Sequence, residues 1–445
     1  MTTLTEQAAE EFLAARAFDP GMPGFVGVAV DLLLDPACVP AGRRALRHGF
    51  LDARSPRVAV VSGPPSPGLD VALRRMSDDL AAAGRVMDGY GLTVLPVAAD
   101  TANPDGPAHV SDSTTAGIRV GLEAGLDGGG PLGLARRWVL AHTLAPVLAA
   151  AFANAPLRDG RPSGWRSVRQ ALRRDLPVLP DPDRSAGAGQ AGTGQESAGY
   201  QPGAVGPRHG GNEGQHGSSR ERGSGTDGRD ENGAGRGSGT DGRDGSGGGR
   251  HGSGTGGWLP GPRVPDSPAE VLEPRRVVDP RLVWAAYVLD SPTVTGRSLR
   301  DRLRGGARLT EADLERHLLS LHPPVAARGH LEIDVADRQP GDGWRVPAAV
   351  VTALLDDPRA AEEAYAATAH LAGEPRLWER AARDALTDPV LADAARACFL
   401  AAYASLARNG ATRELRDAVA DFTETYVHRG RCPADDLLDR ATGRV

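Results

Sequence analysis

The sequence predicts an α+β protein in which helices and strands mix in the first half and helices dominate the end. Apolar and polar residues alternate over residues 24–34, 117–123 and 330–337, the pattern of half-buried strands. Residues 132–153 are apolar around most of a helix surface, which predicts a buried central helix. The chain after Trp344 has helical periodicity throughout, so we expect a helical C-terminal layer.

A segment of biased composition, residues 183–267, separates the two halves. It consists mainly of Gly, Ser, Arg, Asp, Gln and His, and RGSGTDGRD occurs in it twice. Such a segment cannot bury enough apolar surface to offset its ordering entropy, so we expect a disordered insertion. The flanking parts, residues 1–182 and 268–445, are expected to form one domain. RNA binding through the Arg/Gly repeats is an alternative, although the segment lacks interleaved aromatic residues.

The first half contains further elements in chain order. The acidic segment 1–18 reads as an amphipathic helix rather than a signal peptide. Strands are expected at 57–61 and 92–97, and an amphipathic helix at 69–84. After the central helix ends before Pro156, Ser163 or Gly164 should cap a second helix that carries several arginines. These arginines could contact phosphates or form a solvated or salt-bridged face.

The second half begins with a block at 279–292 that could be a helix or a strand. Thr310 is a suitable N-cap for a helix over 309–322, with Asp313 at its third position. Two later helices should begin at Asp357-Pro358 and Asp388-Pro389, where an aspartate cap precedes a proline in the first turn.

Composition limits the function classes. The net charge of −6 argues against a protein that coats nucleic acid. The chain has no lysine, and its three cysteines show neither a disulfide framework nor a zinc motif, which fits a reducing cytoplasm. We expect no membrane span, because no apolar run approaches about 20 residues. Nothing in the sequence defines an oligomeric state.

Polar residues on three of the strands would meet if those strands are neighbours. The residues concerned are Asp31, Arg119, Glu123, Glu332 and Asp334. Converging carboxylates can hold one or more Mg²⁺ ions for nucleotide chemistry, since Mg²⁺ prefers oxygen ligands and substrate phosphates. Alternatively, each strand has an ordinary polar face with cross-strand pairs.

Three sequence blocks resemble a known family. They are RRWVLAHTLAPVLAAAFANAPLRDGRPSGWRSVRQAL from residue 136, LTEADLERHLLSLHPPVAARG from residue 309 and TYVHRGRCPADDLL from residue 425. The chain is similar in all three, and in their order, to the actinobacterial glutamate–cysteine ligases of ergothioneine biosynthesis. The resemblance implies a fold like glutamine synthetase, with an antiparallel sheet whose acidic face binds Mg²⁺–ATP and glutamate. ATP would phosphorylate the γ-carboxylate of glutamate, and the cysteine amine would then displace the phosphate to give γ-glutamylcysteine.

The resemblance also assigns roles to individual residues. They are Arg328 and Glu332 for catalysis, Arg119 and Thr114 for nucleotide binding, and Asp31, Glu123 and Glu332 for Mg²⁺.

Several of the family's motif positions differ in this chain. In the first strand the family has GxVGxExEW, where this chain has Ala29, Asp31 and Leu32 in place of Glu, Glu and Trp. The motif EPGGQxExS is absent, Arg119 replaces a glutamine, and Asp334 replaces an arginine. We therefore keep an alternative function, a catalytically degenerate homologue that binds a metabolite or a protein. A salt bridge between Arg119 and Asp334 would favour that alternative, whereas Asp31, Glu123 and Glu332 within metal-bridging distance would favour the ligase.

Overall fold

The computed structural model describes residues 4–35, 42–99, 115–172 and 279–443, except for residues 129, 159 and 294. The described residues fall in one compact unit that includes both halves of the chain. The predicted insertion, residues 183–267, lies outside the described residues, and so does Thr114.

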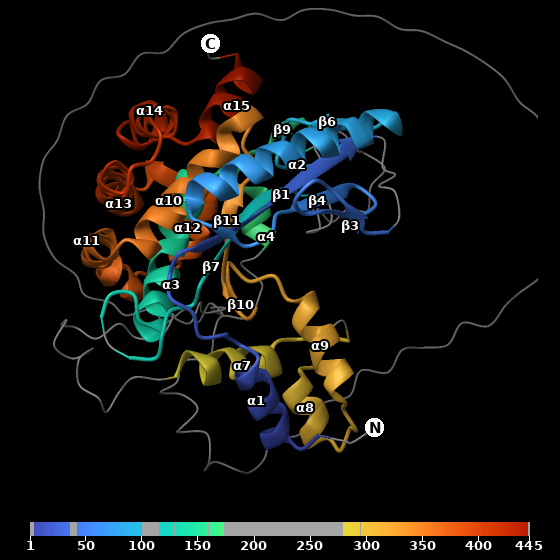
Figure 1. Ribbon diagram of the computed structural model, residues 1–445. Coiled ribbons are helices and arrows are strands. Elements are labelled where there is room, and N and C mark those ends of the chain that lie inside the picture. The colour runs from blue at the N-terminus through green and yellow to red at the C-terminus, as the bar shows by residue number, and fades with distance from the viewer. Residues whose placement is uncertain are drawn as a thin grey trace, which may run out of the picture. The chain divides into compact units, whose positions relative to one another are not determined.

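An antiparallel sheet forms the centre of the unit (Figure 1), with the strand order β10-β11-β7-β1-β4-β3-β2. Its strands are β1 (Phe25–Asp35), β2 (Arg44–Ala45), β3 (Phe50–Ser55), β4 (Val58–Ser62), β7 (Gly117–Leu122), β10 (Val325–Ala327) and β11 (Leu331–Asp337). Two short strands, β5 (Ser66–Pro67) and β6 (Thr93–Leu95), also pair with β1. Because β11 pairs with β7, the chain segments on either side of the insertion share one sheet. The predicted α+β class with an antiparallel sheet is confirmed.

Helices cover one face of this sheet. Helix α2 (Leu69–Gly89) packs on β1 and β4, α10 (Arg345–Asp356) on β7, and α3 (Leu134–Ala151) on β11. The alternate residues Val28, Val120 and Ile333 belong to the same core as these helices. Their neighbours along each strand therefore project from the opposite face, because successive side chains in a strand alternate.

The central helix is α3, as predicted. Its hydrophobic side chains are buried on nearly all sides, and it ends at Ala151, shortly before Pro156. The Trp138 ring meets the rings of Phe18 and Trp284 edge to face, with centroids 5.4 Å and 6.4 Å apart. This helix therefore joins the N-terminal segment, the sheet and the chain beyond the insertion in one core.

A group of four helices packs beside the sheet layer (Figure 1). They are α1 (Glu6–Ala15), α7 (Pro280–Asp290), α8 (Leu299–Arg304) and α9 (Glu311–Ser320). Of the two structures that the sequence allowed for block 279–292, the helix forms, over residues 280–290. The predicted cap is confirmed: Thr310 and Asp313 form a reciprocal capping box at the start of α9.

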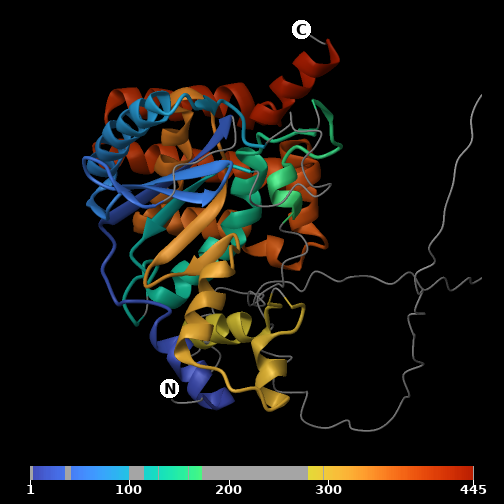
Figure 2. The same ribbon diagram turned by 90° about the vertical axis from the view of Figure 1, so that its right-hand side faces the viewer.

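The C-terminal layer is helical, as predicted, and lies behind the strands in the view of Figure 2. It continues from α10 through α11 (Pro358–Thr368), α12 (Leu377–Arg383), α13 (Pro389–Arg408), α14 (Arg413–Phe422) and α15 (Pro433–Thr442). The side chains of Asp357 and Asp388 cap α11 and α13. Contrary to expectation, α13 is long and apolar enough to cross a membrane, but 56% of its apolar window is buried in this fold, as in a core helix.

Some elements differ from the predictions. Strands β2, β3 and β10 were not expected, because they are short or contain several polar residues. Helix α2 extends to Gly89, beyond the predicted end at residue 84. A short hairpin of β8 (Leu157–Arg158) and β9 (Arg161–Pro162) comes before the basic helix. That helix, α4 (Val168–Leu172), begins four residues after Gly164, since Ser167 is still paired with Ala155 in an isolated bridge.

His142 in α3 is a partly buried histidine that packs against its own helix. Its Nδ1 donates to the carbonyl oxygen of Trp138 at 2.8 Å, and the two rings lie 4.3 Å apart. Burial lowers the pKa of the imidazole to about 4, although the hydrogen bond to the Trp138 carbonyl opposes this shift.

The His142→Gln variant should change how stability depends on pH. An unfolded histidine has a pKa of about 6.5, so between that value and the lower folded pKa the unfolded chain binds more protons. The free energy of unfolding should therefore fall as pH decreases from 6.5 towards 4, by about 2 kcal/mol at pH 5 from this residue. Urea unfolding at pH 7 and pH 5 should show a smaller decrease in the variant. The exposed control His370→Gln should behave like the parent. If the free energy of unfolding decreases equally in His142→Gln, in this control and in the parent, the lowered pKa of His142 is contradicted.

Candidate active site on the polar face of the sheet

The sheet surface opposite helices α2, α3 and α10 carries most of the predicted site residues. We call it the polar face, and its charged members on β1, β7 and β11 are Asp31, Arg119, Glu332 and Asp334. In the strand register Ala29 pairs with Arg119, while Gly121 pairs with Gly27 on one side and Glu332 on the other. The expected juxtaposition of these three strands is therefore confirmed.

Asp31 is the most enclosed acid of the polar face, with no exposed surface. Its Oδ2 accepts hydrogen bonds from Arg54 at 2.7 Å and from the backbone N–H of Gly117 at 3.1 Å. Its Oδ1 accepts from Arg119 at 3.0 Å. Two guanidinium groups therefore share one buried carboxylate, which links β3, β1 and β7.

A second buried ion pair lies on the neighbouring strand β11. Arg169 of α4 donates to Asp334 and lies 3.7 Å from a carboxylate oxygen of Asp337. The guanidinium of Arg169 is fully buried. The salt bridge between Arg119 and Asp334, which would have favoured the non-catalytic alternative, does not form: Arg119 pairs with Asp31, and Asp334 pairs with Arg169.

Both ion-pair clusters coincide with irregularities in the sheet. The register between β3 and β4 shifts at Arg54, and the register between β11 and β7 shifts around Asp334. A β-bulge redirects side chains relative to regular strand alternation. The two shifts lie where Arg54 of β3 and Arg169 of α4 reach the acids of the polar face.

The predicted catalytic residues, Arg328 and Glu332, lie beside each other at the other end of β11. The Arg328 Nε is 3.7 Å from Glu332 Oε1. Arg328 also donates to the backbone carbonyl oxygens of Leu318 and Leu321, which hold it against the end of α9. Glu332 keeps 24% of its side chain exposed, so this carboxylate is open to a substrate.

The three predicted metal ligands do not meet around one ion. Asp31 lies beside Gly117, whereas Glu123 follows six residues later along β7, about 20 Å away by the rise of a strand. Glu332 lies between them, opposite Gly121. Among the residues that the structure describes, no three His, Cys, Asp or Glu side chains are grouped so that they could hold a metal.

Electrostatics distinguishes two arginines of the polar face. Burial alone would lower the pKa of Arg119, but the charges of Asp31, Asp334 and Glu332 outweigh it and raise the pKa above its ordinary value. Burial lowers the pKa of Arg338, and the charges of Asp31 and Asp342 oppose this only in part. Both side chains stay cationic at neutral pH, because arginine titrates above pH 12.

Arg54 and Arg338 were not identified from the sequence as site residues. Arg54 lies in a strand that was not expected, and Arg338 directly follows the motif that ends at Asp337. The one sequence feature that could have pointed to Arg338 is its position, directly after a strand that already carried Glu332 and Asp334.

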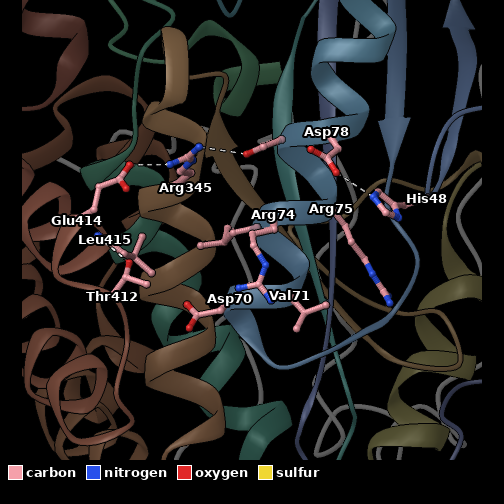
Figure 3. Close-up of a pocket in the computed structure, with 12 residues that line it drawn as sticks. His48, Asp70, Val71, Arg74, Arg75, Asp78, Arg345, Thr412, Glu414 and Leu415 are labelled. Carbon is pink, nitrogen blue, oxygen red and sulfur yellow. Dashed lines mark hydrogen bonds and ion pairs between the residues drawn. The ribbon is translucent and has the colours of Figure 1, made fainter.

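A separate groove of about 610 Å³ opens between α2 and the N-terminal end of α14 (Figure 3). None of the predicted site residues lines it. Some of its charged side chains pair with one another: Arg345 contacts Glu414, and His48 contacts Asp78. Because the predicted site residues lie on the polar face instead, that face is the better candidate for chemistry.

Comparison with known proteins agrees with the sequence resemblance. The glutamate–cysteine ligase family 2 (GCS2) matches residues 109–185 and 263–445, on either side of the predicted insertion. The glutamate–cysteine ligase EgtA of Mycobacterium tuberculosis is 28% identical over 402 residues, which cover 85% of this chain and 74% of that protein. The EgtA of Mycolicibacterium smegmatis is 38% identical over 182 residues, 37% of this chain and 41% of that protein.

Replacement of Asp31 should strongly destabilise the fold. In Asp31→Ala the guanidinium groups of Arg54 and Arg119 stay buried without their shared counter-charge, and breaking a buried pair in this way costs about 3–5 kcal/mol. Asp35→Ala is a matched control on the same strand, because the Asp35 side chain is 62% exposed in its pair with Arg57. The control should lose about 1 kcal/mol or less. Denaturant unfolding measures both, and equal losses in the two variants would contradict the structural role of Asp31.

Proposed function

The chain belongs to glutamate–cysteine ligase family 2, and we propose that it catalyses the ATP-dependent formation of γ-glutamylcysteine for ergothioneine biosynthesis. The observation that carries this proposal is the family match, which includes strands β7 and β11 of the polar face. The relatives named glutamate–cysteine ligase support the same reaction. ATP, glutamate and cysteine are then the substrates.

The reaction has two steps in this proposal. An oxygen of the glutamate γ-carboxylate attacks the γ-phosphorus of ATP, which gives γ-glutamyl phosphate and releases ADP. The amine of cysteine then attacks the acyl carbon, so that the amide bond forms and inorganic phosphate leaves. Cationic side chains stabilise the charge that develops on the transferred phosphoryl group.

We assign the chemistry to the ends of the polar face. Arg328, whose guanidinium is fixed by two carbonyl oxygens, supplies positive charge next to the reacting carboxylate. The partly exposed Glu332 accepts the proton that the cysteine amine loses when it attacks. Arg119 contacts the nucleotide, and Thr114, outside the described residues, is proposed to do the same.

Magnesium, which the family resemblance implies, fits the described residues poorly. Asp31 already accepts hydrogen bonds from two arginines and a backbone N–H, and Asp334 is paired with Arg169. Glu123 and Glu332 are too far from Asp31 along the strands to share an ion with it. We therefore derive no step of the reaction through a metal held by these residues.

The cytoplasm is the proposed location, because it supplies ATP and keeps the cysteine substrate reduced. The two cysteines within the described residues, Cys398 and Cys432, are buried free thiols. Burial is the main factor that raises the pKa of both thiols, to about 12 for Cys398. Both are therefore structural rather than nucleophilic residues.

The purified protein should form γ-glutamylcysteine from ATP, glutamate and cysteine, with one ADP released per dipeptide. Glu332→Gln should lower kcat at least about 100-fold, because it removes the proton acceptor and keeps the side-chain shape. Glu363→Gln, an exposed change on α11, is the matched control and should keep the parent rate.

Product is measured by mass spectrometry and ADP by a coupled assay. A Glu332→Gln rate equal to that of the control would remove the catalytic role of this residue. Bound ATP without any dipeptide product in the parent protein would contradict the ligase function and favour a metabolite-binding role.

A further inference from the structure

The polar face presents guanidinium groups where a metal-binding site would need free carboxylates. A magnesium ion bound by protein requires near-octahedral oxygen ligands. Three of the roughly four lone-pair sites of Asp31 already accept hydrogen bonds, from Arg54, Arg119 and the N–H of Gly117. A metal ion that displaced any of these donors would leave that donor buried without its partner, which is costly.

Arg338 adds a third cation to the same end of the sheet. Its backbone N–H donates to the carbonyl oxygen of Ala116. The next residue, Gly117, donates its N–H to Asp31. Within the described residues its guanidinium donates to the carbonyl oxygen of Gln339 and forms no ion pair of 4 Å or less with a carboxylate. One buried carboxylate, Asp31, therefore lies near three arginines.

The remaining acids of the polar face have partners of their own. Asp334 is paired with Arg169, and Glu332 lies beside Arg328. Arg119 uses one of its five N–H donors for Asp31, and this is its only hydrogen bond to the described residues. At the Asp31 end of the face, Arg119 and Arg338 thus keep N–H donors that no described residue uses, and such donors suit a polyanion.

The backbone at Gly27 leaves room for such a ligand. Gly27 pairs with Gly121 on the polar face, and the His330 ring covers Gly121, where a built β-carbon would lie 2.9 Å from that ring. A β-carbon built on Gly27 would come no closer than 3.8 Å to other atoms. Glycines inside strands often mark places where a ligand approaches the backbone closely.

We propose that Arg119 and Arg338 bind the phosphates of ATP directly, in the position where a protein-held magnesium ion would otherwise neutralise them. Planar guanidinium groups match phosphate oxygens through paired hydrogen bonds, and the chain has no lysine that could take this role. Asp31 then acts as a positioning residue that orients Arg119. This inference rests on the proposed use of ATP, but it concerns how the nucleotide is held rather than whether the dipeptide forms.

Calorimetric titration with ATP tests the proposal, first with MgCl₂ and then with EDTA in place of the metal. The parent protein should bind ATP in EDTA with a Kd within about three-fold of the value in magnesium. Arg119→Gln and Arg338→Gln should each weaken binding about ten-fold or more in both buffers, as expected for the loss of a charge-assisted hydrogen bond. Arg359→Gln, a surface change on α11 with a 72% exposed side chain, is the control and should bind like the parent.

Two outcomes would overturn the proposal: binding that disappears in EDTA, or Arg119→Gln and Arg338→Gln variants that bind as tightly as the control. Thermal unfolding of each variant shows whether a loss of binding reflects misfolding. If one variant fails to fold, the ATP affinity of the other variant still tests the proposal, together with the parent's affinity measured with and without magnesium. A separate assay of dipeptide formation distinguishes this inference from the ligase function. If the protein forms dipeptide but binds ATP only with magnesium, only the inference is refuted. If it binds ATP without magnesium but forms no dipeptide, only the ligase function is refuted.

Discussion

The carboxylate of Asp31 is the interaction on which the polar face depends. It is fully buried and joins three strands through Arg54, Arg119 and the N–H of Gly117. Each guanidinium is acceptable in this enclosed position only because the acid compensates its charge. The orientation of Arg119 follows from that pairing. A change in Asp31 would thus alter both stability and the charge that a ligand meets.

The sign of that charge connects the structure with the family's chemistry. Glutamate–cysteine ligation through an acyl phosphate requires neutralisation of the transferred phosphoryl group. In this chain Asp31 and Asp334 are engaged with arginines, while Arg119 and Arg338 retain donors. The same electrostatic requirement can therefore be met by guanidinium groups. Arg328 and Glu332 lie at the opposite end of β11. The nucleotide at the Asp31 end and the amino acids at this end would then lie side by side along the same face.

Local patterns predicted much of the fold. Strand alternation gave the correct face for Asp31 and Arg119, and the caps at Thr310, Asp357 and Asp388 form as expected. Partners distant in sequence were not predictable: alternation places Arg119 on a face but does not say that it meets Asp31, 88 residues away, rather than Asp334. The β-bulges that bring Arg54 and Asp334 into the network have no clear sequence signature, and the helix that carries Arg169 is only five residues long.

The most direct test of this account is a crystal structure of the protein with a non-hydrolysable ATP analogue and Mn²⁺, in which anomalous scattering locates the metal. The account predicts triphosphate oxygens within hydrogen-bond distance of Arg119 and Arg338, with Asp31 still paired to Arg54 and Arg119. Any Mn²⁺ should be held by the nucleotide and water rather than by Asp31. A manganese ion bound to Asp31, with the arginines turned away from it, would contradict the account.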